Sequence, residues 1–163
     1  LGKPTQDLHS NDIELILRSI ALLHESETYT PKMVKFLNDF SQKTKKFNDE
    51  YIDYIEHLFD SFIGACSKLG DKAFFRNNRF SKTLFESVFV AAATPSFADK
   101  KLITSKIDPT SFEHLKNDEE FVSYLLSGSS SRDNIKGRIK RAKEVLRLHE
   151  ENCNAWFSLR RIR

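Results

Sequence analysis

The sequence contains few of the residues that mark several protein classes. Among 163 residues there are two cysteines, five glycines, four prolines, one methionine and one tryptophan. Two thiols, Cys66 and Cys153, cannot build a disulfide framework, and so little glycine and proline excludes collagen-like and linker-rich chains. No apolar run reaches the roughly 20 residues that span a bilayer, and the first residues lack the hydrophobic stretch of a signal peptide. These absences predict a cytoplasmic protein with reduced thiols and no membrane partner.

The motifs of common catalytic and cofactor sites are also missing. There is no Gly-x-Ser-x-Gly nucleophile elbow and no glycine-rich phosphate loop. The five histidines are scattered, and the only close Cys/His pair is His149 with Cys153, two ligands where structural zinc needs four. Paired carboxylates fall at predicted helix ends, where the helix dipole accounts for them. We therefore expect no catalytic residue, metal or cofactor in this chain.

The periodicity of apolar residues predicts an all-α protein. Apolar side chains recur at spacings of three and four rather than two, which is typical of helices with one buried face. A chain of this length, 39% apolar and 30% charged, fits a single domain. We expect an irregular bundle of six or seven helices, at about 12–24, from 30 onward, at 48–69, 81–94, 108–115, 117–125 and 132–150. Asn11, Thr30 and Asn117 are expected to cap helices and Thr94-Pro95 to end one, while residues 96–107 form a short helix or an irregular linker.

The apolar stripes of two of these helices are expected to face the core. The helix at 12–24 carries Ile13 and Ile16, and the helix at 48–69 carries Ile52, Ile55 and Phe59.

The chain divides into three predicted segments. Residues 1–127 form a helical core, 128–131 a Ser/Gly loop, and 132–163 a basic C-terminal helix and tail. The loop is expected to be mobile and could detach the last helix from the bundle. Because position 1 is Leu rather than Met, we also expect the chain to be a fragment of a longer protein.

Positive charge gathers at the C-terminus. The net charge is +3, but residues 132–163 carry ten Lys or Arg against four Asp or Glu, whereas residues 1–131 carry 16 against 19. On a helix, five of these ten cations fall within a sector of about 80°. They are Arg132, Lys136, Lys140, Lys143 and Arg147. Beside them runs an apolar stripe of Ile135, Ile139, Ala142, Leu146 and His149.

This basic face predicts contact with nucleic acid. Its five cations extend over about 22 Å, a length over which a helix could follow phosphate groups without reading bases. Two other interpretations stay open: a solvated amphipathic helix with pairs such as Lys140 and Glu144, or a helix whose stripe packs against a protein partner.

A secondary basic cluster lies before the helix expected at 81–94. Its cations are Arg76, Arg79 and Lys82, and they alternate with Phe74, Phe75 and Phe80. Cations beside exposed aromatic rings could hold phosphate and stack a base. A chain with 14 phenylalanines must bury most of them, however, so we favour a structural role.

Two single residues also have structural interpretations. Arg18 stands in a nearly apolar helix, where a guanidinium needs a carboxylate or carbonyl partner, so we expect an ion pair. Cys66 lies on an apolar stripe, where a free cysteine behaves as a small hydrophobic residue.

Several runs of the N-terminal part resemble a known family. They are Asp12 to Leu22, Phe36-Leu37-Asn38, Phe75, and Arg79 to Glu86. Over about residues 10–95 the chain is similar to the helical C-terminal half of the GmrSD-type modification-dependent restriction proteins, bacterial proteins that begin with a ParB-like nucleotide-hydrolysing domain. The family's catalytic motifs belong to that upstream domain and, in some members, to a downstream HNH-type nuclease domain. The resemblance therefore implies a part of a nucleotide-dependent endonuclease that carries no catalytic residue itself.

Together these observations lead to one main hypothesis and one alternative. The first is a non-catalytic helical domain of a restriction-type antiphage defence protein, which supports an upstream nuclease domain and contacts the DNA backbone through its basic last helix. The alternative is a protein interaction or oligomerisation module without nucleic-acid binding, anchored by the stripe of that helix and by Trp156 and Phe157.

Overall fold

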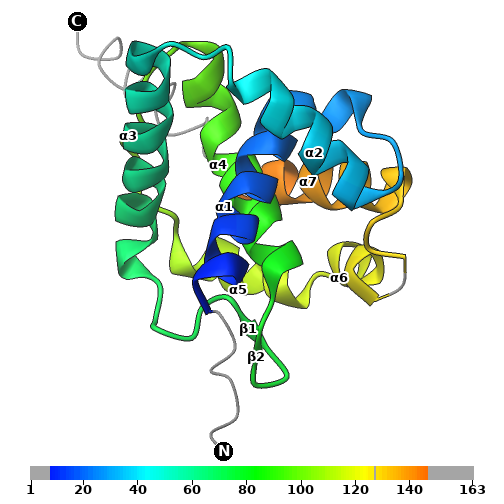
Figure 1. Ribbon diagram of the computed structural model, residues 1–163. Coiled ribbons are helices and arrows are strands. Elements are labelled where there is room, and N and C mark those ends of the chain that lie inside the picture. The colour runs from blue at the N-terminus through cyan, green and yellow to red at the C-terminus, as the bar shows by residue number, and fades with distance from the viewer. Residues whose placement is uncertain (1–7, 127, 147–163) are drawn as a thin grey trace, which may run out of the picture.

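The chain folds as an all-α bundle, as predicted. The computed structural model describes residues 8–126 and 128–146, with side chains from residue 11 onward. In this part the helices are α1 (Leu8–Glu25), α2 (Met33–Thr44), α3 (Asp49–Ala65), α4 (Lys82–Ala98), α5 (Pro109–Asn117), α6 (Glu119–Leu126) and α7 (Arg132–Leu146). Two short 3-10 helices, η1 (Ser26–Thr28) and η2 (Cys66–Lys68), and a hairpin of β1 (Phe75–Arg76) and β2 (Arg79–Phe80) complete it (Figure 1).

Helix α4 is the centre of the bundle. All ten residues from Leu84 to Ala93 are buried, which is typical of a helix that other elements surround. Helices α1 and α7 make the most extensive contacts with it, while α3 packs on it along one edge of the molecule (Figure 1). Helices α5 and α6 pack on α7, and α2 packs on α1, so the core runs from α1 through α4 to α7.

The last helix is part of this core and is not detached. The apolar stripe predicted on it is buried through its described length: Ile135, Ile139, Ala142 and Leu146 are at most 6% exposed. Helix α7 packs against α4, α5 and α6. The prediction of a separable helix was wrong because burial of this stripe holds α7 in the bundle, whatever the composition of the loop before it.

Hydrogen bonds also tie the Ser/Gly loop to its surroundings. The buried Tyr29 hydroxyl donates to the Ser130 carbonyl over 2.8 Å, and the Asn134 amide donates to the Gly128 carbonyl over 3.0 Å. The Ser131 hydroxyl accepts from the Asn134 backbone N–H and caps α7. The loop that we expected to be mobile is therefore hydrogen-bonded both to Tyr29, which follows η1, and to α7.

Three helices start where the sequence predicted, each with a side-chain cap. The side chains of Asn48, Ser81 and Asp108 accept backbone N–H groups at the starts of α3, α4 and α5, over 2.9, 3.3 and 2.8 Å. Pro109 occupies the first turn of α5, where its missing N–H costs nothing.

Other helix starts lie elsewhere than predicted. Helix α1 begins at Leu8, so Asn11 lies inside it rather than capping it. Helix α2 begins at Met33, after Lys32 with a φ of 101°, rather than at Thr30-Pro31. At α6 the cap is Asp118, whose carboxylate accepts from the Phe121 N–H over 2.8 Å, and not Asn117.

The prediction that Pro95 ends α4 was wrong. The helix continues to Ala98, so the proline lies inside it. A proline removes one backbone hydrogen bond, and a helix already buried through its preceding turns tolerates that loss near its end. The segment expected to be irregular therefore starts only after Ala98.

The polar segment after α3 forms a hairpin that the sequence analysis missed. Phe75 pairs with Phe80 and Arg76 with Arg79, and the two residues between them, Asn77 and Asn78, have φ values of 48° and 59°. Two successive positive φ values fit a type I′ turn, for which asparagine is well suited. The Asn-Asn pair was the available signal.

Three isoleucines expected in the core are exposed instead. Ile13 is 65% and Ile16 38% exposed on α1, and Ile52 is 48% exposed on α3. Helix α3 buries Leu58, Phe62 and Ala65, a face rotated away from the predicted stripe.

No described helix is long and apolar enough to cross a bilayer.

Candidate nucleic-acid interface

The candidate site is the side of α7 beside η1. Because α7 is unbroken from Arg132 to Leu146, the side chains of Arg132, Lys136, Lys140 and Lys143 share one sector of it, next to the buried stripe. We call these four residues the basic face. Arg147, the fifth predicted member, lies outside the described residues.

One end of the basic face contacts η1. Lys136 Nζ lies 2.6 Å from Glu27 Oε2, and Arg132 donates to the Glu27 carbonyl oxygen over 3.3 Å. The hydrogen bond from Lys136 lowers the pKa of the Glu27 carboxyl. Sequence analysis missed Glu27, since its partners lie more than 100 residues away along the chain.

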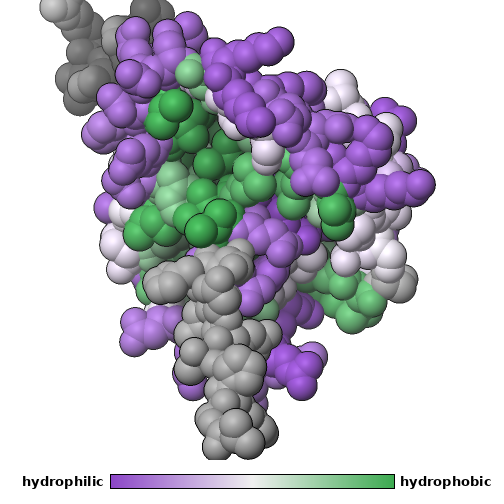
Figure 2. Space-filling view, viewed as in Figure 1, coloured by the Kyte–Doolittle hydropathy of each residue, from purple (hydrophilic) through white to green (hydrophobic). Residues whose placement is uncertain are grey.

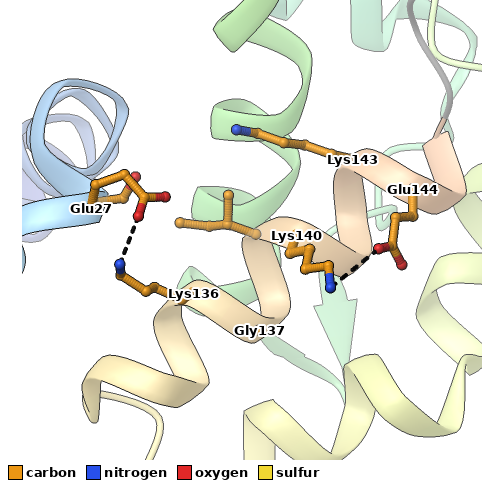
Figure 3. A pocket seen from close by; sticks show the side chains of 8 residues that line it. Glu27, Lys136, Gly137, Lys140, Lys143 and Glu144 are labelled. Carbon is orange, nitrogen blue, oxygen red and sulfur yellow. Dashed lines mark hydrogen bonds and ion pairs between the residues drawn. The ribbon is translucent and has the colours of Figure 1, made fainter.

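The two remaining lysines are less constrained. Lys143 makes no ion pair with any described residue, and partial burial lowers its pKa. Lys140 approaches Glu144 at 3.9 Å, but its side chain is 80% exposed, so this pair contributes little. Figure 3 shows the amines of Lys136 and Lys143 pointing toward the side of η1, whereas that of Lys140 points away from it.

A shallow cavity lies among these side chains. Its volume is about 420 Å³; Gly137 and Ile139 line it, together with the three lysines, Ser26, Glu27 and Glu144 (Figure 3). Three amines and two carboxylates leave one net positive charge around the cavity, and Arg132 beside it adds another. The arrangement can therefore attract an anionic group, with Glu27 as its principal competitor.

Two further arginines of α7 are not available to a ligand. Arg141 Nη2 lies 2.6 Å from Asp118 Oδ2, which with the helix-capping hydrogen bond holds the pKa of the Asp118 carboxyl at about 2. Arg138 is fully buried. The basic character of α7 is therefore shared between its surface and the interior of the bundle.

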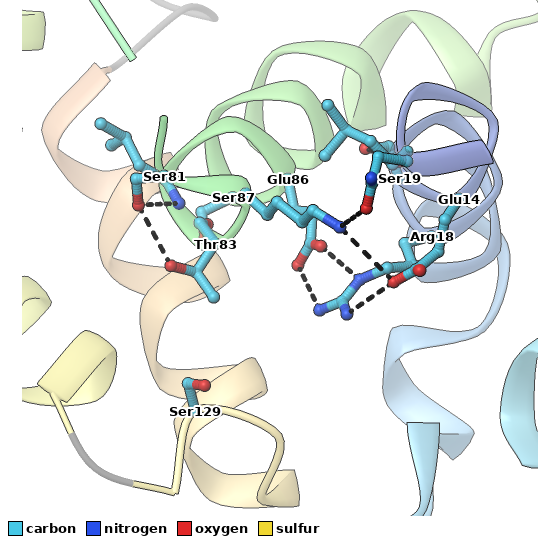
Figure 4. A network of polar contacts seen from close by, with 12 residues as sticks. Glu14, Arg18, Ser19, Ser81, Thr83, Glu86, Ser87 and Ser129 are labelled. Carbon is cyan, nitrogen blue, oxygen red and sulfur yellow. Dashed lines mark hydrogen bonds and ion pairs between the residues drawn. The ribbon is translucent and has the colours of Figure 1, made fainter. Parts of the chain in front are cut away.

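The buried arginine belongs to an ionic network that also includes Arg18. Glu86 of α4, itself fully buried, receives Arg18 Nε at 2.5 Å and Arg138 Nη2 at 3.0 Å. Figure 4 shows Arg18 and Glu86 pointing toward one another between α1 and α4. The predicted ion pair of Arg18 is confirmed, and Arg138 Nη1 also donates to the Ser129 carbonyl. One carboxylate thus connects α1, α4, α7 and the loop before α7.

Burial opposes the charge on both guanidinium groups, but the net shifts of their pKa values have opposite directions. Burial lowers the pKa of Arg138 despite the attraction of Glu86. Burial also opposes the charge on Arg18, but the attraction and hydrogen bond of Glu86, with a smaller effect of Glu14, outweigh it and raise the pKa. Both arginines stay charged at neutral pH, so the network holds two positive charges against one buried negative charge.

The secondary basic cluster does not join the basic face. Arg76 donates to the Lys116 carbonyl over 2.7 Å, and Lys82 lies 3.8 Å from Glu14, while Arg79 is exposed on the hairpin. Figure 1 shows this hairpin projecting from the end of the bundle near α5, whereas α7 crosses its middle. Phe74 is partly buried and packs on Phe85 and Phe112 against the core. Phe80, in contrast, is 42% exposed on the hairpin, so the structural role that we favoured for the phenylalanines fits Phe74 and not Phe80.

Two findings concern metal and thiol chemistry in the described residues. They contain no group of three His, Cys, Asp or Glu side chains that could hold a metal ion. Burial raises the pKa of the Cys66 thiol to about 12, so it carries almost no thiolate at neutral pH.

Comparisons with known proteins add no relative to this account. No protein-family model, curated protein or solved structure matches the chain. The basic face is therefore the feature of the chain from which a function can be inferred.

Proposed function

We propose that this chain is a non-catalytic helical domain that binds the phosphate backbone of DNA on the basic face of α7. One observation carries the proposal: four cations share one side of a helix whose adjacent apolar stripe is buried in the core. Two of them, Arg132 and Lys143, have no carboxylate partner among the described residues. Their charge is therefore available to a ligand.

The geometry suits phosphate contact without base reading. Arg132 and Lys143 are 11 residues apart, about 16 Å along a helix at 1.5 Å per residue. Phosphates follow one another at about 3.4 Å of axial rise per strand, so the face could meet several of them. A helix fixed to a bundle loses little entropy on binding, because only its lysine and arginine side chains must become ordered.

The expected affinity is modest and depends on salt. Glu27 already holds Lys136, and Glu144 lies near Lys140, so a phosphate must compete with two carboxylates. Contacts to phosphate carry no sequence information, and the binding should therefore be the same for unrelated duplexes.

The resemblance of residues 10–95 to GmrSD-type restriction proteins supplies a setting for this activity. In that setting the chain is the helical part of a cytoplasmic antiphage defence protein and supports an upstream nuclease domain. The nuclease domain would carry the chemistry, and the basic face would hold the substrate near it.

Charge substitutions test the proposal in both directions. Lys140→Ala with Lys143→Ala should weaken duplex binding at least tenfold in low salt, because two of four cations are lost. Glu27→Gln should strengthen it, because the carboxylate that competes for Lys136 is removed. The matched control, Lys68→Ala with Lys72→Ala, removes two exposed lysines outside the face and should change binding little. Fluorescence anisotropy of a labelled duplex measures all four proteins.

Equal binding by the parent and the Lys140/Lys143 variant would contradict the assignment of the face. So would weaker binding by the Glu27→Gln variant with an unchanged fold. The alternative that α7 binds a protein partner through its stripe needs Ile135, Ile139 and Leu146 to be free, yet the core buries all three.

A further inference from the structure

A second surface, far from α7 in sequence, is exposed and apolar. Helices α1, α2 and α3 carry five large aliphatic side chains between 38% and 75% exposed: Ile13, Ile16, Val34, Ile52 and Ile63. Figure 2 shows hydrophobic surface in the hollow between α3 and α1, with hydrophilic surface on either side. A cavity of about 490 Å³ between α1 and α2 adjoins Ile13 and Val34. Exposed apolar surface that gathers on one side of a molecule is typical of a docking site.

The hydrophilic border of this surface on α3 is acidic. Asp49, Asp53, Glu56 and Asp60 fall within one sector of about 60° of the helix, and all four are exposed. None of them makes an ion pair with a described residue. The exposed Ile52 and Ile63 are helical neighbours of these carboxylates, Ile52 with Glu56 and Ile63 with Asp60. The outer side of α3 is therefore amphipathic, with an apolar strip directly beside a negative one.

The chemistry of this surface selects a partner that is both apolar and basic. Apolar side chains would cover the isoleucines, and cations would meet carboxylates that no described residue neutralises. Because the acidic strip carries four unpaired charges, a neutral or acidic partner would leave them beside a newly desolvated interface, at a cost in free energy.

A segment with this chemistry follows α7 in the same chain. Residues 147–163 carry four arginines against two glutamates, Glu150 and Glu151. The last eight residues are purely apolar and basic in character apart from one serine, with Trp156, Phe157, Leu159 and Ile162 beside Arg160, Arg161 and Arg163. Seventeen residues can reach about 56 Å when extended. A folded domain of this size has a radius of gyration of about 15 Å, so the segment can reach any part of its surface.

We propose that residues 147–163 dock on the surface formed by α1, α2 and the outer side of α3. The aromatic and aliphatic side chains of the segment cover the exposed isoleucines, and its arginines face the acidic strip of α3. The proposal goes beyond DNA binding and does not depend on it, because it uses none of the four residues of the basic face.

The single tryptophan makes the proposal testable in the full chain. Trp156 lies in the segment and is the only tryptophan present, so its emission and its quenching by acrylamide report the segment alone. We expect blue-shifted emission and slower quenching in the full chain than in a free peptide of residues 147–163. Reversing the strip with Asp53→Lys, Glu56→Lys and Asp60→Lys should restore the emission and quenching of the free peptide. Ile52→Ser with Ile63→Ser should act in the same direction without a change of charge.

A matched control separates docking from net charge. Asp71→Lys, Glu113→Lys and Glu119→Lys change the charge by the same amount at exposed positions outside the surface, and should leave Trp156 shielded. Circular dichroism checks that every variant keeps its helices.

Three results would overturn the proposal. Trp156 could be as accessible in the parent as in the peptide. It could be shielded but insensitive to both α3 variants, which would place the segment elsewhere. Its shielding could depend on protein concentration, which would identify a second copy of the chain as the occupant.

Discussion

Glu86 of α4 connects α1 and α7 in the interior of the bundle. It is fully buried and accepts from two guanidinium groups, Arg18 of α1 and Arg138 of α7. Buried ion pairs are not strongly stabilising compared with apolar packing, but removing one partner leaves uncompensated charge in the interior. Here the remaining charges would be two, of the same sign.

Glu86→Gln should therefore destabilise the protein severely. We expect a loss of about 3 to 5 kcal/mol in the free energy of unfolding, measured by urea denaturation followed by circular dichroism. The control is Glu14→Gln, which removes the other carboxylate near Arg18 but at a side chain 46% exposed, and should cost less than about 1 kcal/mol. Similar losses for the two variants would contradict the central role of Glu86.

Asp118 links stability to pH at the junction of α5 and α6. Its folded-state pKa is about 2, below the ordinary value of 3.8, chiefly because Arg141 hydrogen-bonds to the carboxylate. A depressed pKa contributes stability that is fully present above pH 4 and is lost as the pH falls toward 2. Asp118→Asn keeps a capping side chain but loses the charge, so its stability should lack this component of the acid-induced decrease.

Urea midpoints measured from pH 6 to pH 2 check this expectation. The difference between the parent and Asp118→Asn should be largest near neutral pH and should shrink below pH 4. A difference that stays constant across this range would mean that the ion pair with Arg141 adds nothing to stability.

At the scale of elements, α6 and α7 meet at a glycine. A Cβ atom added at Gly137 would lie 2.5 Å from the Tyr124 ring, so only glycine lets the two helices approach as they do. Gly137→Ala should cost about 1 kcal/mol through displacement of the ring. In a Tyr124→Ala background the same change should instead stabilise by up to about 1 kcal/mol, because alanine is the better helix former.

A double-mutant cycle of thermal unfolding measures this change of sign. If Gly137→Ala has the same effect in both backgrounds, the contact between Gly137 and the Tyr124 ring does not determine the spacing of α6 and α7.

Local signals in the sequence predicted where helices start better than they predicted how the helices pack. The helix starts predicted at Asn48, Ser81 and Asp108 are confirmed. Each of these side chains accepts a hydrogen bond from the backbone three residues later and needs no distant partner. Pro95 and the stripe of α3 misled the prediction, because burial on several sides decides whether a helix survives a proline and which of its faces turns inward. Neither is a property of the local sequence.

At the scale of the whole molecule, the unpredicted features are contacts between distant residues. The apolar surroundings of Arg18 in the sequence predicted an ion pair. Nothing in the sequence indicated that Glu86 would be the partner or that Arg138 would pair with the same carboxylate. The basic sector of α7 follows from helical spacing alone, whereas its contact with Glu27 depends on how η1 is placed by the bundle. Helix α7 thus has two different sides, one buried with Arg138 and one exposed with the basic face.

The salt dependence of DNA binding by the unmodified chain tests this account most directly. Anisotropy titrations of a labelled duplex between about 50 and 200 mM salt should give a slope of log K against log salt between about −2 and −4, since up to four phosphates are neutralised. Two unrelated duplexes should give the same slope and affinity. No binding at the lowest salt, or binding with a slope near zero, would contradict the claim that the exposed side of α7 is a phosphate-binding surface.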